Sequence, residues 1–255
     1  MTLLTKNWTR NWAENWERME EYIQYLSFGN KGWGDELLYG LSITVRLFVA
    51  TLPLGLVLGF LIALAKRSDK KWLSISANIY TTIFRGVPEL LTLFIIFYGG
   101  QILLQTIVEL FVDDVRVDLS AFLAGMIALG FVFSAYASET FLSALNAVPP
   151  GQAEAARAMG MSWFRTMQKV VFPQVMRHAL PGLSNLTLIL QKETALVSIL
   201  ALDEVLRQTQ LAVGNTKEPI FFFATACGLF ILLAFLTSIL FKRIEIWADR
   251  GQQRA

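Results

Sequence analysis

Five long apolar stretches dominate this sequence, and they restrict the chain to a bundle of membrane-spanning helices. A helix needs about 20 residues to cross the roughly 30 Å hydrocarbon layer of a bilayer, and within that layer its backbone polar groups must bond internally. Every stretch meets the length requirement. The stretches are 37–65, 73–108, 119–148, 179–202 and 219–241. We therefore predict an all-α, polytopic helical membrane protein with about five transmembrane helices.

The composition excludes most classes of soluble protein. Hydrophobic residues make up 55% and charged residues 16% of the 255-residue chain, against about 45–50% and about 25% in an ordinary soluble domain. A single cysteine, Cys227, and a single histidine, His178, offer too few ligands for a metal site and suggest no Ser-His-Asp arrangement. The net charge of +2 gives no reason to expect nucleic acid as a partner. We expect neither an enzyme nor a metalloprotein.

The distribution of charge between the connecting segments predicts the orientation of the chain. Segments 66–71, 147–180 and 242–255 would share one side of the membrane, and they hold 12 Lys/Arg against 4 Asp/Glu. The segments on the other side hold 7 Lys/Arg against 13 Asp/Glu. Because Lys and Arg are enriched in cytoplasmic loops, we predict that the N-terminus lies outside and the C-terminus inside.

The chain divides into an N-terminal arm (1–36), a transmembrane domain (37–248) and a cytoplasmic tail (249–255). The arm contains no apolar run long enough for a cleaved signal peptide. Its large apolar residues recur at three- and four-residue steps, as on one face of a helix. They are Trp8, Trp12, Trp16, Met19, Ile23 and Leu26. Because Trp favours the headgroup level, we interpret the arm as a helix on the outer (periplasmic) membrane surface. A solvated tail is the alternative.

One predicted cytoplasmic loop, 149–180, is much longer than an ordinary connector, and loops beyond about 12–15 residues usually have a function. Residues 152–159 are strong helix formers, and Gly160 permits the left-handed turn that commonly ends a helix. Ser162 can cap a second helix, which we expect to end before Pro173. The segment therefore predicts a helix–turn–helix projection suited to a partner's groove. An amphipathic loop lying on the inner leaflet is the alternative.

The residues of this loop resemble a known motif. Glu154-Ala155-Ala156, followed by Gly160 and later by Phe172-Pro173, is similar to the EAA motif of the permease subunits of bacterial ABC importers. Other segments resemble the polar amino-acid branch of that family, of the histidine/lysine/arginine/ornithine or opine type. They are Phe84-Arg85-Gly86-Val87-Pro88, Glu139-Thr140-Phe141, Val148-Pro149-Pro150-Gly151-Gln152, Arg177-His178-Ala179-Leu180-Pro181, Asn185 and Glu193-Thr194-Ala195-Leu196-Val197-Ser198. The resemblance extends over residues 37–245.

The resemblance implies a transport subunit of the bacterial cytoplasmic (inner) membrane whose coupling loop engages a dimer of ATP-binding subunits. The residues expected to make this contact are Glu154, Ala155, Ala156, Arg157, Met159 and Gly160. The chain has no GxxxxGK[ST] segment to hold phosphates, so we expect ATP and Mg²⁺ on the partner and no cofactor here. An extracytoplasmic substrate-binding protein and a second permease subunit, a paralogue more often than an identical copy, complete the expected assembly.

Six charged residues fall at membrane depth, where charges are costly and commonly functional. They are Arg46, Arg85, Glu89, Glu139, Lys192 and Glu193. We hypothesise that Glu89, Glu139 and Glu193 make a permeation path acidic enough to favour a cationic guanidinium or ammonium group. The alternative is that these charges pair with Arg85, with Lys192 or with a neighbouring subunit. The segment 86–88, Gly-Val-Pro, predicts a break in the helix at this depth.

The predicted function is therefore translocation of polar, cationic amino acids or opines by alternating access coupled to a separate ATPase. Lys192-Glu193-Thr194-Ala195-Leu196 stands where many relatives have Lys-Asp-Thr-Ser-Leu, which leaves the role of Glu193 open. A glutamine- or glutamate-type substrate is an alternative. A secondary carrier or channel would also use broken helices and intramembrane charge, but it needs no helical projection for a motor.

Overall fold

The computed structural model describes residues 19–29, 31–111 and 117–249, and the described residues are mainly helical, without a β-strand. A bent pair, Trp163–Leu200 and Val205–Thr216, turns by 52° and counts as one candidate span. Four more helices in the described part are long and apolar enough to cross a bilayer. They are Gly34–Lys66, Glu89–Glu109, Ala121–Ala147 and Pro219–Ala248. These four spans, or five with the bent pair, confirm the predicted all-α, polytopic membrane fold.

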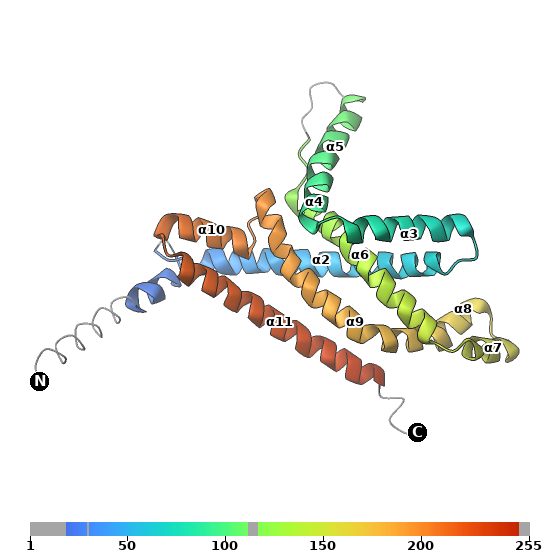
Figure 1. Cartoon of the computed structure of the whole chain (residues 1–255). Coiled ribbons are helices and arrows are strands. Elements are labelled where there is room, and N and C mark those ends of the chain that lie inside the picture. Colours follow the sequence, from blue (N-terminus) through green and yellow to red (C-terminus); the bar gives the residue numbers. More distant parts are fainter. Residues whose placement is uncertain (1–18, 30, 112–116, 250–255) are drawn as a thin grey trace, which may run out of the picture.

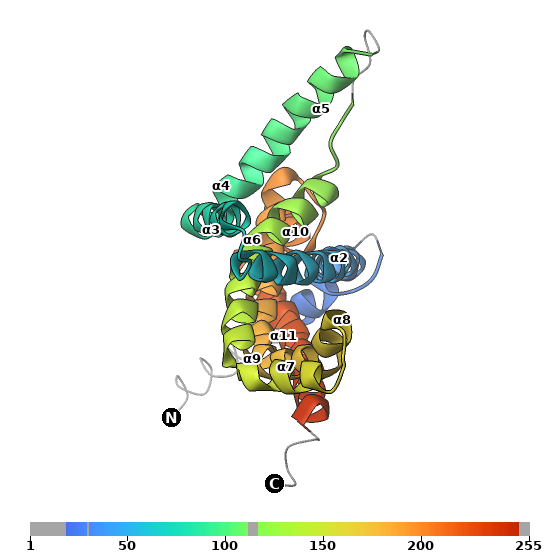
Figure 2. The ribbon, with the colours of Figure 1, turned by 90° about the vertical axis from the view of Figure 1, so that its right-hand side faces the viewer.

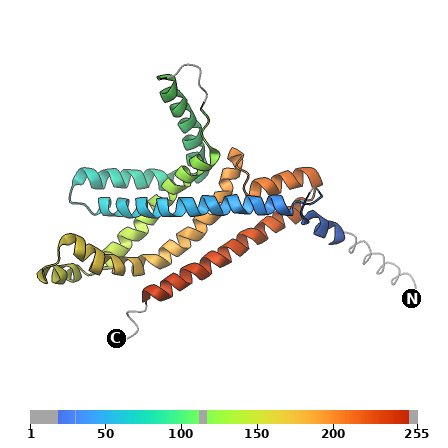
Figure 3. The same cartoon turned by 180° about the vertical axis from the view of Figure 1, so that it is seen from behind.

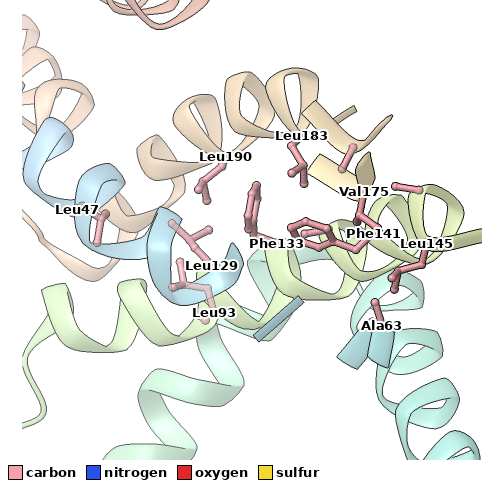
Figure 4. Close-up of a cluster of buried hydrophobic side chains, with 14 of the residues drawn as sticks. Leu47, Ala63, Leu93, Leu129, Phe133, Phe141, Leu145, Val175, Leu183 and Leu190 are labelled. Atoms are coloured by element: carbon pink, nitrogen blue, oxygen red, sulfur yellow. The ribbon is translucent and has the colours of Figure 1, made fainter. Parts of the chain in front are cut away.

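Helix α6 (Ala121–Ala147) forms the centre of the bundle. It packs against α2 (Gly34–Lys66), α3 (Lys71–Gly86) and α9 (Phe172–Glu193) (Figure 1). Within its most apolar window 61% of α6 is buried, against 11% for α11 (Pro219–Asp249). Side chains from α2, α6 and α9 fill the space between the helices (Figure 4). They include Leu47, Leu129, Phe133, Phe141, Leu145, Val175, Leu183 and Leu190.

Two glycines allow α2 and α6 to approach each other closely. A Cβ added at Gly59 would lie 2.9 Å from the Cβ of Ala137 and 3.0 Å from the carbonyl oxygen of Ser134. A Cβ added at Gly55 would overlap the ring of Phe133. Small residues are common where membrane helices meet, because lipid supplies no hydrophobic force between helices and association depends on close packing. Helices α2 and α6 are therefore closely packed against each other along this stretch.

The second apolar stretch contains the predicted break at 86–88, and the break separates two helices. Helix α3 ends at Gly86, Val87 and Pro88 are extended, and a new helix begins at Glu89. Helix α3 runs back alongside α2, whereas the new helix leaves the bundle at a steep angle (Figures 1 and 3). The new helix alone has the length of a span. It consists of α4 (Glu89–Phe94), a π-helical turn η1 (Ile95–Gly99) and α5 (Gly100–Glu109).

The helix that we expected to end before Pro173 instead continues, so that prediction is wrong. Pro173 lies in the first turn of α9. A π turn inserts one residue into a helix, and the π turn directly before α9 relaxes the backbone where proline lacks an N–H donor. The helical path runs on to Leu200, turns at Ala201, and leads into α10 (Val205–Thr216) beside α2. Besides α9, the helical path from Trp163 to Leu200 consists of α8 (Trp163–Thr166), η2 (Met167–Val171) and η3 (Thr194–Leu200).

The described end of the N-terminal arm packs against the start of α11. Residues 19–25 are helical, and the ring of Tyr22 stacks on Phe221 with the centroids 4.5 Å apart. Three residues of the predicted apolar stripe are exposed here: Met19, Ile23 and Leu26. The other three lie outside the described residues: Trp8, Trp12 and Trp16. Contact of this face with the membrane surface stays a prediction, and the predicted tail beyond Asp249 also lies outside the described residues.

Candidate functional site

The loop 149–180 begins with a helical hairpin at the end of the bundle where α2 and α6 also end (Figures 1 and 2). Helix α7 (Pro150–Ala158) starts with a proline, whose missing N–H would have no helical partner there. Gly160 has a φ of +82°, in the left-handed region that favours glycine. The Ser162 hydroxyl oxygen accepts a hydrogen bond from the Arg165 amide at 3.4 Å and caps α8. The predicted turn and cap are confirmed.

Five of the six predicted coupling residues lie on the surface of the hairpin. They are Glu154, Ala155, Arg157, Met159 and Gly160. Ala156, the sixth, is only 5% exposed and faces the interior of its own chain. Its small side chain therefore allows α7 to pack against its own subunit, and Ala156 is not available for contact with a partner.

Two aromatic residues extend this surface, and the sequence analysis did not single them out as contact residues. Trp163 is 58% exposed and Phe164 67% exposed, and both follow the turn that presents Met159, which is 80% exposed. Large apolar side chains in the first turn of a short helix within the predicted cytoplasmic loop are the signal that identifies them. Apolar side chains grouped on an otherwise polar projection are typical of a protein-docking surface.

Glu139 is paired with two cations from other helices. Its Oε1 atom lies 2.6 Å from Nζ of Lys66 at the end of α2 and 2.9 Å from a guanidinium nitrogen of Arg85 at the end of α3. The Arg85 guanidinium also lies over the ring of Tyr136, 5.5 Å from its centroid. Within this chain Glu139 and Arg85 therefore have partners, as the pairing alternative expects. Hydropathy places Lys66 in the predicted loop 66–71, whereas in the structure it is the last residue of α2.

Glu89 and Glu193 form a different arrangement. Glu89 opens α4 and Glu193 closes α9, next to Lys192 in the sequence, and Glu89 and Lys192 are electrostatic neighbours of Glu193. Both carboxylates are half-buried and Lys192 is exposed. No ion pair joins either carboxylate to a cation within the described residues. The structure thus brings two of the three predicted path carboxylates together and places the third, Glu139, in a separate ion-pair cluster.

Glu204 is a buried acidic residue that the sequence analysis did not single out. It is fully buried and caps α10 by accepting a hydrogen bond from the Arg207 amide at 2.9 Å. It also accepts a hydrogen bond from the Thr44 hydroxyl of α2 at 3.4 Å. The sequence analysis treats this region as a connecting segment, and an acidic residue directly before a helix-compatible run is the signal that would have identified the cap. Glu204 ties α10 to α2.

Comparison with known proteins identifies the family. Residues 55–247 match the family model described as binding-protein-dependent transport system inner membrane component. The chain belongs to this family. The match covers all the apolar helices except the first part of α2, and it includes the hairpin. It confirms the multi-pass membrane location and shows that this inner membrane component is a transport subunit.

Individual relatives agree with this assignment. The inner membrane component is 37% identical over 233 residues to the octopine transport system permease protein OccQ of Rhizobium meliloti, which covers 91% of this chain and 98% of the relative. It is 41% identical over 206 residues to the histidine/lysine/arginine/ornithine transport system permease protein HisQ of Salmonella typhimurium, with 81% and 89% covered. It also resembles a crystal structure of an amino acid ABC transporter with histidines, at a TM-score of 0.70 and 30% identity, with 84% and 94% covered.

Proposed function

We propose that this inner membrane component imports cationic amino acids or opines by alternating access, driven by ATP hydrolysis on a separate dimer of ATP-binding subunits. The exposed hairpin formed by α7 and α8 is the observation that supports this proposal. Its outer surface combines an acidic and a basic side chain, Glu154 and Arg157, with the exposed Met159, Trp163 and Phe164. Such a surface suits docking in a groove of a partner protein, on which ATP and Mg²⁺ would be bound.

The hairpin is mechanically connected to the interior of the bundle. The helical path from Trp163 to Leu200 is continuous and, at about 1.5 Å per residue, is about 55 Å long. A displacement of the hairpin by the ATP-binding subunits would therefore move the α9 end that holds Glu193. Rigid elements that move together in this way are a common basis for switching between conformations.

The substrate class follows from Glu89 and Glu193. Two half-buried carboxylates that form no ion pair within the described residues would favour a guanidinium or ammonium group, which would relieve their mutual repulsion. The names of the relatives OccQ and HisQ are consistent with such substrates. Glutamine and glutamate would bring only an α-ammonium group, whereas a cationic amino acid adds a second positive charge on its side chain and would relieve the repulsion further. We keep the glutamine and glutamate class as the second candidate because Lys192 lies beside Glu193.

Uptake by reconstituted vesicles tests the substrate class. Vesicles would contain the inner membrane component with its ATP-binding, second permease and substrate-binding subunits, and would take up labelled arginine or glutamine. We expect Glu89→Gln together with Glu193→Gln to reduce arginine uptake by at least tenfold and to reduce the preference over glutamine. Asp203→Asn, which removes an exposed carboxylate from the predicted outer side, is the matched control. An unchanged preference in the double variant would exclude the acidic path.

The energy source is tested separately. We expect no uptake when the ATP-binding subunit or ATP is omitted, whatever ion gradient is applied. Uptake driven by an ion gradient through the inner membrane component alone would instead establish a secondary carrier or channel.

A second permease subunit is part of the proposed assembly. The helix formed by α4 and α5 projects from the bundle (Figure 1), and only 11% of its most apolar window is buried within the chain. Its large apolar side chains are exposed. They include Leu91, Ile95, Tyr98, Ile102, Leu103 and Ile107. We propose that a paralogous permease subunit covers part of this surface, and that both subunits together line the path.

A further inference from the structure

A cavity of about 450 Å³ lies beneath the coupling hairpin. Its walls come from the end of α2 and the loop that follows, the end of α6, and α7 and α8. The floor is apolar and includes Leu64, Leu145 and Val171. The volume falls within the range of about 300–1,000 Å³ that is usual for small-molecule sites. The cavity is therefore large enough for a ligand headgroup.

Two guanidinium groups line the cavity from separate elements. Arg67 follows α2, and Arg157 belongs to α7. Arg67 donates a hydrogen bond from one terminal nitrogen to the carbonyl oxygen of Leu145 at 3.1 Å, which fixes the guanidinium and leaves its other N–H groups for a ligand. The lining contains one carboxylate, Asp69, so the charge of the cavity is positive. Guanidinium groups fit the oxygen atoms of a phosphate particularly well, because they donate two parallel hydrogen bonds.

A buried hydroxyl group provides an independent indication of a ligand. Thr166 lines the cavity and is only 3% exposed, and its Oγ1 atom is buried without a hydrogen-bond partner in the described part of the chain. Buried hydroxyl groups in proteins are nearly always hydrogen-bonded, and an unsatisfied one is destabilising. A ligand oxygen inside the cavity would accept the missing hydrogen bond.

We propose that this cavity binds the phosphate headgroup of an anionic phospholipid of the inner leaflet. The proposal uses the predicted orientation, in which the hairpin faces the cytoplasm, and does not depend on the transported substrate. Lys66, the last residue of α2, places the cavity at the end of a span, where a headgroup is within reach. Basic pockets between membrane helices on the cytoplasmic side are suited to anionic lipids, and the half-exposed Trp163 at the rim prefers the headgroup level.

The ligand would connect two parts of the chain that are expected to move during transport. Its phosphate would lie between Arg67, at the end of α2, and Arg157, on the hairpin. Arg157 and Trp163 border both the cavity and the outer surface of the hairpin, whereas Glu154, Met159 and Phe164 do not line the cavity and stay free for the ATP-binding subunit. Bound lipid would therefore brace α7 against the closely packed helices α2 and α6.

Lipid binding to the purified full-length chain tests this proposal. The probes are phosphatidylglycerol, phosphatidylcholine and inorganic phosphate in a neutral detergent, with binding measured by native mass spectrometry and by thermal unfolding. We expect phosphatidylglycerol to bind more tightly than the other two and to raise the unfolding temperature. Arg67→Gln and Thr166→Val should each weaken this binding by about tenfold. Arg165→Gln is the matched control, because it removes the same charge from an exposed position of α8 that does not line the cavity.

Thr166→Val also separates a binding effect from a folding effect. Because the hydroxyl group that it removes has no partner, the lipid-free variant should be at least as stable as the original chain. Three results would overturn the proposal: unchanged binding in both cavity variants, equal binding of phosphatidylglycerol and inorganic phosphate, or loss of lipid binding whenever the ATP-binding subunit is present. The last result would assign the cavity to the subunit interface.

Discussion

Replacing Glu139 by Gln should destabilise the chain much more than replacing Arg85. The side chain of Lys66 is 4% exposed and relies on Glu139, 2.6 Å away, for its counter-charge. The Glu139→Gln variant leaves that ammonium group buried and unpaired, which costs about 3–5 kcal/mol. The side chain of Arg85 is 44% exposed, so Arg85→Gln removes a solvated ion pair that contributes only about 0–1 kcal/mol.

Thermal unfolding of the full-length chain in detergent measures the difference. At roughly 2–4 °C per kcal/mol for a chain of this size, Glu139→Gln should lower the midpoint by about 6–20 °C, and Arg85→Gln by less than about 4 °C. Adding Lys66→Met to Glu139→Gln should recover most of the loss, because the stranded charge is then removed. Equal midpoints for the Glu139 and Arg85 variants, or no recovery in the double variant, would refute the assignment of Glu139 to this ion-pair cluster.

Three further predictions concern the hairpin and the helix contacts. Gly160→Val should abolish co-purification with the ATP-binding subunit, whereas Gly160→Asn should retain part of it. The space around Gly160 is open, so only its left-handed backbone restricts the residue, and Asn tolerates that conformation. Equal loss in both variants would contradict this. Gly59→Ala should lower the free energy of unfolding by about 1–3 kcal/mol through overpacking, whereas Gly214→Ala, which meets no atom within 4 Å, should leave it unchanged or raise it, as denaturant titration would show. Glu204→Ala should lower the free energy of unfolding by about 1–2 kcal/mol through the lost cap, and Thr44→Val should lower it by less. The opposite order in the same titration would show that the contact with α2 matters more than the cap.

The sequence predicts the hairpin in detail because its determinants act over a few residues. The left-handed turn at Gly160 and the cap by Ser162 depend only on local backbone chemistry. The expected helix end at Pro173 fails because a neighbouring π turn, which the sequence pattern does not reveal, accommodates the proline. The pairing of Lys66 with Glu139 depends on where α2 crosses α6, and hydropathy contains no information on that crossing. The burial of Ala156 likewise depends on how α7 is rotated about its own axis.

Because α6 lies at the centre of the bundle, α6 and α11 should tolerate different substitutions, although both are candidate membrane spans. Most of the apolar window of α6 contacts protein, whereas that of α11 is almost entirely uncovered within the chain. At the exposed positions of α11, any apolar side chain suits its surroundings, so substitutions among aliphatic residues cost little; a few residues, such as Phe222 and Ala226, are buried against the rest of the chain. Along α6, each side chain must also match the shape of its neighbours. Hydrophobicity is therefore the main requirement at the exposed positions of α11. A change in α6 requires a matching change in α2 or α9.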